Sequence, residues 1–326
     1  MTSSLSVAIC TRDRPQSLRR AIDSVLQSHI PDRMVVKLMV VDDGALPTEL
    51  IEGARRDTEH AGLRFEYVRK QPAERGLFNS RLEVLRRCST EVVLFLDDDV
   101  EVAPDYLAVL HRRYAERPDL AGLGGVNELA PLASRRWLIF SRLFLLRSSA
   151  RGRLSLAGFP WSQHDWPQQR HTFESEYLSG SNMSFRVRTL QEVTPVAWLE
   201  GYSLGEDLYL SAAARRHGQL HVDPALRVRH HFEEVGRPDD VLLAESIVLN
   251  HYRLAQRNHP ALTRKAAVVW AAIGLCLQAA KNSRLNQCGG YVRGIFKVFF
   301  GTAREGLAAA GPNDRLSPSA RTGFRP

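Results

Sequence analysis

The sequence predicts an α/β fold, a mostly parallel Rossmann-like sheet flanked by helices, with a helical extension at the C-terminal side. Strand-like and helix-like segments alternate over about the first hundred residues, as they do in such sheets. Residues 92–96 are five consecutive apolar residues, which is typical of a strand buried on both faces of a parallel sheet. After about residue 239 the alternation gives way to long amphipathic and apolar helix patterns.

Length and charge set broad limits. The chain has 326 residues, 44% of them hydrophobic, enough to bury a sizeable core in one large or two modest domains. Its net charge of +8 favours anionic partners: phosphate-bearing substrates, nucleic acid or an anionic membrane. No basic stripe interleaved with aromatic residues stands out, so we expect no nucleic-acid partner.

The cysteine pattern favours a reducing compartment. The four cysteines are Cys10, Cys88, Cys276 and Cys288. They are scattered without a Cys-x-x-Cys motif, which is typical of core thiols and not of a zinc site or a disulfide framework. The start of the chain does not have the pattern of a signal peptide, since a strand-like run begins at Leu5 and the first basic residue is Arg12. We expect a cytoplasmic protein.

The segments of the first half can be assigned in order. Strands are predicted at residues 5–10, 35–41, 63–68, 92–96 and 121–126. Helices are predicted from Pro15, over residues 49–58, after Gly76 and from Pro104, because apolar side chains recur there at helical spacing. Proline is favoured in the first turn of a helix, which supports the helices at Pro15 and Pro104.

Polar residues follow three of these strands, in the stretches Thr11-Arg12-Asp13, Asp42-Asp43-Gly44 and Asp97-Asp98-Asp99. If the strands are parallel, their ends meet at one sheet edge, where open α/β sheets bind ligands. Crowded carboxylates repel one another, and a divalent cation is the usual reason to gather them. A solvated acidic turn is the alternative reading, but the triple Asp after a buried strand favours a metal site.

Two common nucleotide motifs are absent from the sequence. No Gly-x-Gly-x-x-Gly follows the first strand, and no Gly-x-x-x-x-Gly-Lys-Ser/Thr occurs. A nucleotide at this edge would therefore be held by carboxylates on its base and ribose and by a metal on its phosphates.

The second half contains further polar stretches. Residues 137–146 form an apolar run too short to span a bilayer, either a packed helix or an apolar wall for a lipid-linked acceptor. The small residues around Gly180 suit close approach of a ligand to the backbone. Glu206 and Asp207 begin a predicted helix, where acidic residues are also favoured by the helix dipole alone. A histidine pair, His230 and His231, follows an extended segment.

Together these stretches resemble family 2 glycosyltransferases, the large inverting family with the GT-A fold. The resemblance rests on residues 7–12, residues 40–44, the pair Gly76 and Arg81, and residues 95–99. In the second half, residues 180–186 and the Glu206-Asp207 pair resemble the family's remaining motifs. One departure is that the family often has Arg-Asn where this chain has Arg81-Leu82.

The resemblance implies roles for the donor site. In the Asp-x-Asp motif, Asp99 would bind Mn²⁺ or Mg²⁺, and Asp97 would lie near the ribose and contribute to the metal site. Asp98 belongs to the same motif. Asp42, with Asp43 beside it, would contact the nucleobase. Further donor contacts are expected from Thr11, Arg12, Asp13, Gly76 and Arg81.

It also implies roles for the catalytic half. Gly180 and Asn182 would border the donor sugar and the acceptor. Asp207, in one motif with Glu206, would deprotonate the acceptor hydroxyl. We favour His230 over His231 as the histidine that completes the metal shell or touches the diphosphate.

The implied function is an inverting, metal-dependent transfer of a sugar from a nucleoside-diphosphate donor to a hydroxyl of a glycan or lipid-linked acceptor. A sugar-phosphate nucleotidyltransferase is one alternative, but it normally needs a Gly-rich basic loop after the first strand, and residues 11–15 lack one. A catalytically inactive membrane-bound scaffold is the other. The intact set Asp97, Asp99 and Asp207 argues against it.

We expect a catalytic domain over residues 1–238, in which residues 1–126 bind the nucleotide sugar and 127–238 form the acceptor and catalytic half. Residues 239–310 would be a helical extension, and 311–326 a disordered tail. The apolar run 266–280 has fifteen residues, fewer than the roughly 20 of a spanning helix. The extension is therefore expected either to pack as a soluble bundle or to lie on the cytoplasmic face of a membrane.

Overall fold

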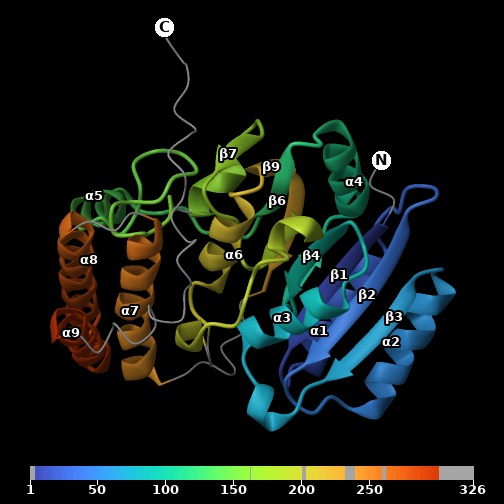
Figure 1. Ribbon diagram of the computed structural model, residues 1–326, viewed down its shortest axis with the longest axis horizontal. Coiled ribbons are helices and arrows are strands. Elements are labelled where there is room, and N and C mark those ends of the chain that lie inside the picture. Colours follow the sequence, from blue (N-terminus) through green and yellow to red (C-terminus); the bar gives the residue numbers. More distant parts are fainter. Residues whose placement is uncertain (1–3, 162, 200–202, 232–238, 259–261, 301–326) are drawn as a thin grey trace, which may run out of the picture.

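The computed structural model describes residues 4–161, 163–199, 203–231, 239–258 and 262–300. Its centre is a nine-stranded sheet with the order β3-β2-β1-β4-β8-β6-β9-β5, and β7 pairs with β9 (Figure 1). The strands are β1 (Ser4–Thr11), β2 (Val35–Asp42), β3 (Arg64–Arg69), β4 (Val92–Asp97), β5 (Val100–Val102), β6 (Leu120–Asn127), β7 (Phe173–Ser175), β8 (Asn182–Arg186) and β9 (Gln219–His230).

The first four strands form the predicted parallel layer. They are joined by α1 (Pro15–Leu26), α2 (Thr48–His60) and α3 (Leu77–Arg87). Thr11 lies beside Asp42 in the register of β1 and β2, and Cys10 lies beside Asp97 in that of β1 and β4. Because the register aligns these ends, the polar stretches that follow β1, β2 and β4 meet at one edge of the sheet.

The second half of the chain extends the same sheet. β8 runs antiparallel to both β4 and β6, β6 is parallel to β9, and the short β5 is antiparallel to β9. This topology brings the start of β8 to the end of β4, where Leu96 pairs with Asn182. It also places His230 opposite Val100, directly after the triple Asp. Helices α4 (Tyr106–Glu116) and α6 (Glu206–Ala214) flank this part.

The central strand is buried on both faces, as its apolar run predicts. Val92, Leu94 and Leu96 belong to a core cluster shared with α1 and α4. Val93 and Phe95 belong to a second cluster, on the other face, shared with α3 and α6. Alternating side chains therefore fill both layers, and the carboxylates that follow are the first residues to leave the sheet interior.

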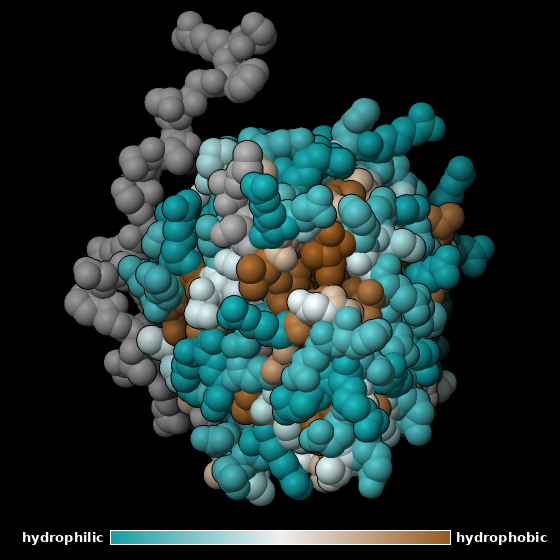
Figure 2. Space-filling view, turned by 90° about the vertical axis from the view of Figure 1, so that its right-hand side faces the viewer, coloured by the Kyte–Doolittle hydropathy of each residue, from teal (hydrophilic) through white to brown (hydrophobic). Residues whose placement is uncertain are grey.

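A third core cluster joins the C-terminal helices. It lies among α5 (Arg135–Leu143), α7 (Asp240–Asn258), α8 (Leu262–Lys281) and α9 (Leu285–Phe300). Figure 1 shows α7 between α6 and the α8–α9 pair, at the end of the molecule opposite β2 and β3. The side of β2, β3 and α2 faces the viewer in Figure 2 and is mostly hydrophilic, with a hydrophobic area near its centre.

Two predictions about apolar segments need correction. The fifteen-residue apolar run 266–280 lies inside a helix of twenty residues, α8, because the helix begins at Leu262 and continues to Lys281. By length and composition it is the one helix in the described part of the chain that could cross a membrane. Helix α5 ends at Leu143, before the predicted residue 146, because the backbone turns left-handed at Leu145, with φ 55°.

The predicted domain limits stay predictions. One continuous sheet crosses the boundary at residue 126, and residue 238 lies outside the described residues. The tail predicted over 311–326 also lies outside them.

Candidate active site

The three carboxylates after β4 point to three different partners. Asp98 accepts hydrogen bonds from Thr11 Oγ1 at 2.6 Å and from Arg14 Nη1 at 3.2 Å, which ties it to the end of β1. Asp97 Oδ1 pairs with Arg81 Nη2 at 3.1 Å. Asp99 Oδ1 lies 2.9 Å from His230 Nε2, and its Oδ2 lies 3.6 Å from Arg14. The local turn thus gives each carboxylate one partner of its own, and Arg14 is shared by Asp98 and Asp99.

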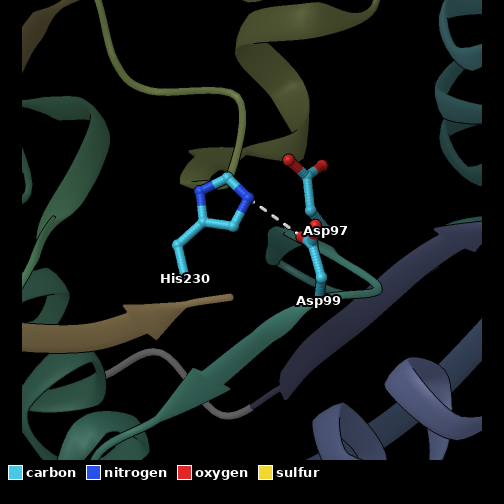
Figure 3. Close-up of side chains that lie close together, drawn as sticks. All are labelled: Asp97, Asp99 and His230. Atoms are coloured by element: carbon cyan, nitrogen blue, oxygen red, sulfur yellow. Dashed lines mark ion pairs between the residues drawn. The ribbon is translucent and has the colours of Figure 1, made fainter. Parts of the chain in front are cut away.

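Asp97, Asp99 and His230 form a group that could hold a metal ion, since one ligand atom from each lies within 4.8 Å of the others (Figure 3). The pairing of β5 with β9 brings His230 to Asp99. His231, the residue after β9, has a different partner: its ring nitrogen Nε2 lies 3.1 Å from Glu101 Oε1. Of the two histidines, the structure brings His230 to the acidic group.

Burial and crowding change the ionisation of this group. Burial raises the pKa of Asp97, an effect that Arg81 opposes, and burial raises the pKa of Asp98 to about 6. Burial alone would lower the pKa of His230, but its hydrogen bond to Asp99 and the nearby carboxylates outweigh that effect and raise it. A cation between these side chains would relieve their mutual repulsion.

The carboxylates after β2 have a different environment. Asp42 is fully buried and accepts hydrogen bonds from the backbone N–H groups of Gly44 at 2.8 Å and Leu46 at 3.0 Å, and from Tyr67 Oη at 2.8 Å. Asp43 accepts from the Gly76 N–H at 2.8 Å. Asp42 therefore holds its own turn, and the contact of this pair with a nucleobase stays a prediction.

The end of β1 is tied to the same turn. Asp13 adopts a left-handed φ of 55° and accepts from the Ala45 N–H at 3.1 Å. Arg12 is exposed and lies 3.9 Å from the Asp13 carboxylate. Of the predicted donor residues here, Thr11 and Asp13 are held by hydrogen bonds, and Arg12 is exposed.

Two basic residues escaped the sequence analysis. Arg14 faces the acidic group, as described above. Lys70 is buried just past β3, where its Nζ lies 3.4 Å from Asp43 and donates to the Gly76 carbonyl at 3.3 Å and to Ser80 Oγ at 3.1 Å. The sequence did contain a pattern that could have identified both. Each is a basic residue within three positions of a strand end, at the sheet edge that also carries the carboxylates.

Arg81 joins the donor edge to the catalytic half. It is 1% exposed and extends from α3, and its Nη2 donates to Asp97 and, at 2.8 Å, to the Gly180 carbonyl. Its Nη1 donates to Glu206 at the start of α6. Burial raises the pKa of Glu206, which Arg81 opposes. Arg81 and Glu206 thus form a buried link between α3, β4 and α6.

Asp207 is held next to this link. Helix α6 begins at Glu206 after Gly205, whose φ of 91° suits glycine. The Asp207 carboxylate accepts from the Gly180 N–H at 3.3 Å and from the Leu208 N–H at 2.8 Å. Burial raises the pKa of Asp207, and its charge contributes to the raised pKa of Asp97. The predicted base and the predicted metal ligands therefore share one electrostatic environment.

The two residues predicted to border the sugar have different environments. Gly180 lies between Arg81 and Asp207, and a Cβ there would meet Glu206 Oε1 at 3.1 Å and Arg81 Nη1 at 3.3 Å, so the backbone approaches closely. Asn182 is 1% exposed, and its Oδ1 accepts from the Gly125 N–H at 2.7 Å inside the sheet. Contact of Asn182 with a donor stays a prediction.

Comparisons with known proteins agree on family and fold. Residues 6–159 match the family described as Glycosyl transferase family 2. The search of curated protein sequences gives no match.

Three solved structures are similar to this chain. GalNAc-T7 with UDP, GalNAc and Mn²⁺ superposes with TM-score 0.58 at 14% identity, covering 94% of this chain and 58% of that one. The mannosyltransferase PcManGT from Pyrobaculum calidifontis, with GDP-Man and Mn²⁺, gives 0.54 at 17% identity, covering 92% and 81%. S. aureus TarS 1–349 with UDP-GlcNAc gives 0.54 at 14% identity, covering 90% and 81%.

At these identities the structural likeness shows the fold alone, and this chain spans 58% of the GalNAc-T7 chain. The match of residues 6–159 adds the similarity to a family, which the superpositions do not show. Residues 6–159 of this chain match glycosyltransferase family 2, and the chain has the GT-A fold.

Proposed function

We propose that the protein transfers a sugar from a nucleoside-diphosphate donor to an acceptor hydroxyl, with inversion at the anomeric carbon. The observation that carries the proposal is the juxtaposition of Asp97, Asp99 and His230 with the buried Arg81, Glu206 and Asp207 on one sheet edge. In this proposal the first group would hold a divalent cation for the donor diphosphate, and Asp207 of the second group would be the base beside it.

The donor nucleotide would bind at the ends of β1 and β2. Thr11, Arg12, Asp13, Asp42 and Asp43 lie at these strand ends, and we propose that carboxylates among them contact the base and ribose. Solved relatives of this fold hold UDP, UDP-GlcNAc or GDP-Man. In this proposal residues 1–126 bind the donor, and 127–238 supply the acceptor side and the base.

The donor set at the end of β4 fits a divalent ion. Two carboxylates and an imidazole converge there, and carboxylate oxygens are ligands that divalent ions prefer. Asp99, Asp97 and His230 would hold Mn²⁺ or Mg²⁺. A bound divalent ion would neutralise the charge that develops on the leaving diphosphate.

Asp207 would act as the general base. As the acceptor oxygen bonds to the anomeric carbon, the bond from that carbon to the diphosphate oxygen breaks, and Asp207 takes the hydroxyl proton. The Gly180 N–H fixes the carboxylate. Single displacement requires one base and no enzyme nucleophile, and passes through an oxocarbenium-like state of the kind known for glycoside hydrolysis.

Arg81 and Glu206 would position this machinery. Arg81 holds Asp97 and the Gly180 carbonyl from one guanidinium, so the metal ligand and the base share a single anchor. Glu206 balances the charge of Arg81 in a site from which water is largely excluded.

The acceptor is proposed to be a glycan or lipid-linked hydroxyl, and the reaction to take place in the cytoplasm. All four cysteines are free thiols, which fits a reducing compartment.

One experiment tests the proposal in two steps. A thermal-shift screen of nucleoside diphosphates and nucleotide sugars, with and without Mn²⁺, should show a metal-dependent rise in Tm for one nucleotide class, because ligands stabilise the state that they bind. The matching donor is then incubated with acceptors, and NMR of the product should show the anomeric configuration opposite to that of the donor. Retention of configuration would overturn the single-displacement mechanism, and no stabilisation by any nucleotide would overturn the donor site.

A further inference from the structure

The exposed large hydrophobic side chains gather on three helices. Eleven of the sixteen that are exposed in the described part of the chain lie on α5, α8 or α9. They are Ile139, Leu143, Leu262, Trp270, Ile273, Leu277, Leu285, Val292, Phe296, Phe299 and Phe300. We call this surface the α5–α8–α9 face. So dense a group of exposed apolar side chains indicates an interaction surface.

Helix α8 is apolar on both sides. Its inner side packs Ala267, Ala271 and Ala272 against the third core cluster. Its outer side carries Leu262, Trp270, Ile273 and Leu277 at the three- and four-residue spacings of one helix face. A surface helix of a globular protein normally has a polar outer side, so the apolar outer side of α8 suits an apolar environment.

The three helices form one continuous surface. The Trp270 indole N–H donates to the Leu143 carbonyl at 2.8 Å, and its ring stacks on Phe144 with centroids 5.0 Å apart, which joins α8 to α5. Lys265 Nζ lies 5.2 Å from the centroid of the Phe299 ring, which joins α8 to α9. The apolar stripe of α8 therefore has α5 on one flank and α9 on the other.

The charge of this face has one sign. The three helices contain eight Lys or Arg residues and no Asp or Glu. Arg293 and Lys297 pair with Glu245 of α7. The other six, Arg135, Arg136, Arg142, Arg264, Lys265 and Lys281, form no ion pair with any described residue, and neither does Arg284 in the connection.

We propose that the α5–α8–α9 face docks on the surface of an anionic lipid bilayer, with its helices in the plane of the interface. Exposed apolar side chains together with basic residues that form no ion pair are typical of interfacial helices. In such helices the burial of apolar area and the attraction to anionic lipids both contribute to binding. A second copy of the chain would bring two like-charged faces together, which disfavours self-association. A spanning α8 would have to leave its alanine packing on the core.

This inference rests on the proposed function and narrows the acceptor to a lipid-linked one. Helix α7 connects the face to the base: Asn250 Nδ2 donates to the carbonyl of Leu204, two residues before α6 begins. The donor-binding strands β1, β2 and β3 lie on the far side of the molecule from α8 and α9 (Figure 1). Donor and lipid-linked acceptor would therefore reach the site from opposite directions.

Liposome flotation of the full chain tests the docking without any need for activity. The chain should float with vesicles of equal parts phosphatidylcholine and phosphatidylglycerol, less with phosphatidylcholine alone, and less at high salt. The double variant Lys281→Glu, Arg284→Glu should weaken partitioning about thirtyfold or more, since each basic residue near an anionic surface contributes about fivefold. Ile273→Ser with Phe296→Ser should also release the protein, by removing the apolar part.

The matched control is Arg112→Glu with Arg188→Glu, which changes the net charge equally at exposed positions outside the face. It should float nearly as well as the parent. The docking proposal is wrong if the parent stays at the bottom at low salt, or if the control loses as much as the Lys281 and Arg284 variant. It is equally wrong if alkaline carbonate fails to release the chain, which indicates a spanning helix, or if the parent is a dimer that Phe296→Ser dissociates.

Discussion

Two strands of this sheet, β2 and β4, both end in adjacent aspartates, yet the two carboxylate groups do different things. After β2, Asp42 has three donors from its own turn and from Tyr67, so its charge is satisfied inside the protein. After β4, Asp97 and Asp99 face each other and His230, and burial raises the pKa of Asp97 and Asp98. The first group stabilises a turn, and the second places carboxylates close together in a group that could hold a metal ion.

The comparison gives a general criterion. A buried carboxylate whose oxygens accept several backbone hydrogen bonds contributes to stability, because these bonds replace the hydrogen bonds that it made to water in the unfolded state. A buried carboxylate surrounded by other carboxylates lowers stability unless a cation is present. The same sequence pattern, an apolar strand followed by Asp-Asp, thus predicts a location but not a role.

The largest effect is expected at Asp207, the proposed base beside the second group. Asp207→Asn keeps the shape and can still accept from the Gly180 N–H, but it cannot take a proton. We expect kcat to fall by about 10²–10⁴-fold while the affinity for the donor stays close to that of the parent. Asp119→Asn, at an exposed ion pair with Arg117, is the control. If Asp207→Asn kept more than about a tenth of the activity, the base would be another residue.

Asp99→Ala tests the second group directly. The Kd for a nucleoside diphosphate in the presence of Mn²⁺ should rise at least about 100-fold, since even partners that only orient metal ligands are worth 10–100-fold. Glu101→Ala is the matched control, because Glu101 is two residues away and pairs with His231 outside the group. Titration calorimetry with and without Mn²⁺ measures both. Equal affinities for the two variants would remove Asp99 from the metal site.

Asp42→Ala tests the first group. It leaves the Gly44 and Leu46 N–H groups and the Tyr67 hydroxyl without their acceptor, so the free energy of unfolding should fall by about 2 kcal/mol. Asp99→Ala should lower it less, because removing one of several crowded carboxylates relieves repulsion. Urea unfolding without metal checks this order. The contrast between the two strand ends fails if Asp99→Ala is the more destabilising of the two.

The last prediction concerns the turn that Asp42 holds. A Cβ at Gly44 would collide with the Asp13 side chain and lie 3.0 Å from the Asp13 backbone nitrogen, so Gly44→Ala should lower stability by about 1–3 kcal/mol. Gly53→Ala is the control, since Gly53 lies inside α2 with Arg19 Nη1 3.9 Å from the added Cβ. That substitution should raise stability by up to about 1 kcal/mol, because alanine is the better helix former. Thermal unfolding of both variants decides the matter, and a loss of stability in Gly53→Ala would show that space alone does not explain the difference.

The sequence by itself determined the positions of the strands and helices and the sheet edge at which the polar stretches meet. Hydrophobic periodicity is a local property, so the run at residues 92–96, the helix after Pro15 and the polar stretches after three strands could all be identified without a partner. Parallel pairing then followed from the alternation of strands and helices. For the same reason the triple Asp, the Glu206-Asp207 pair and the His230-His231 pair could be marked as candidates.

Only the tertiary structure decided what those candidates contact. The choice of His230 over His231 depends on the register of β9 against β5, two strands more than a hundred residues apart in sequence. The link from Arg81 to Glu206 joins residues 125 positions apart, and no local pattern encodes it. The outer side of α8 is exposed because α7 and α9 cover the other side, although the sequence is apolar on both. These contacts depend on which distant segments pack together, and local sequence patterns do not show that.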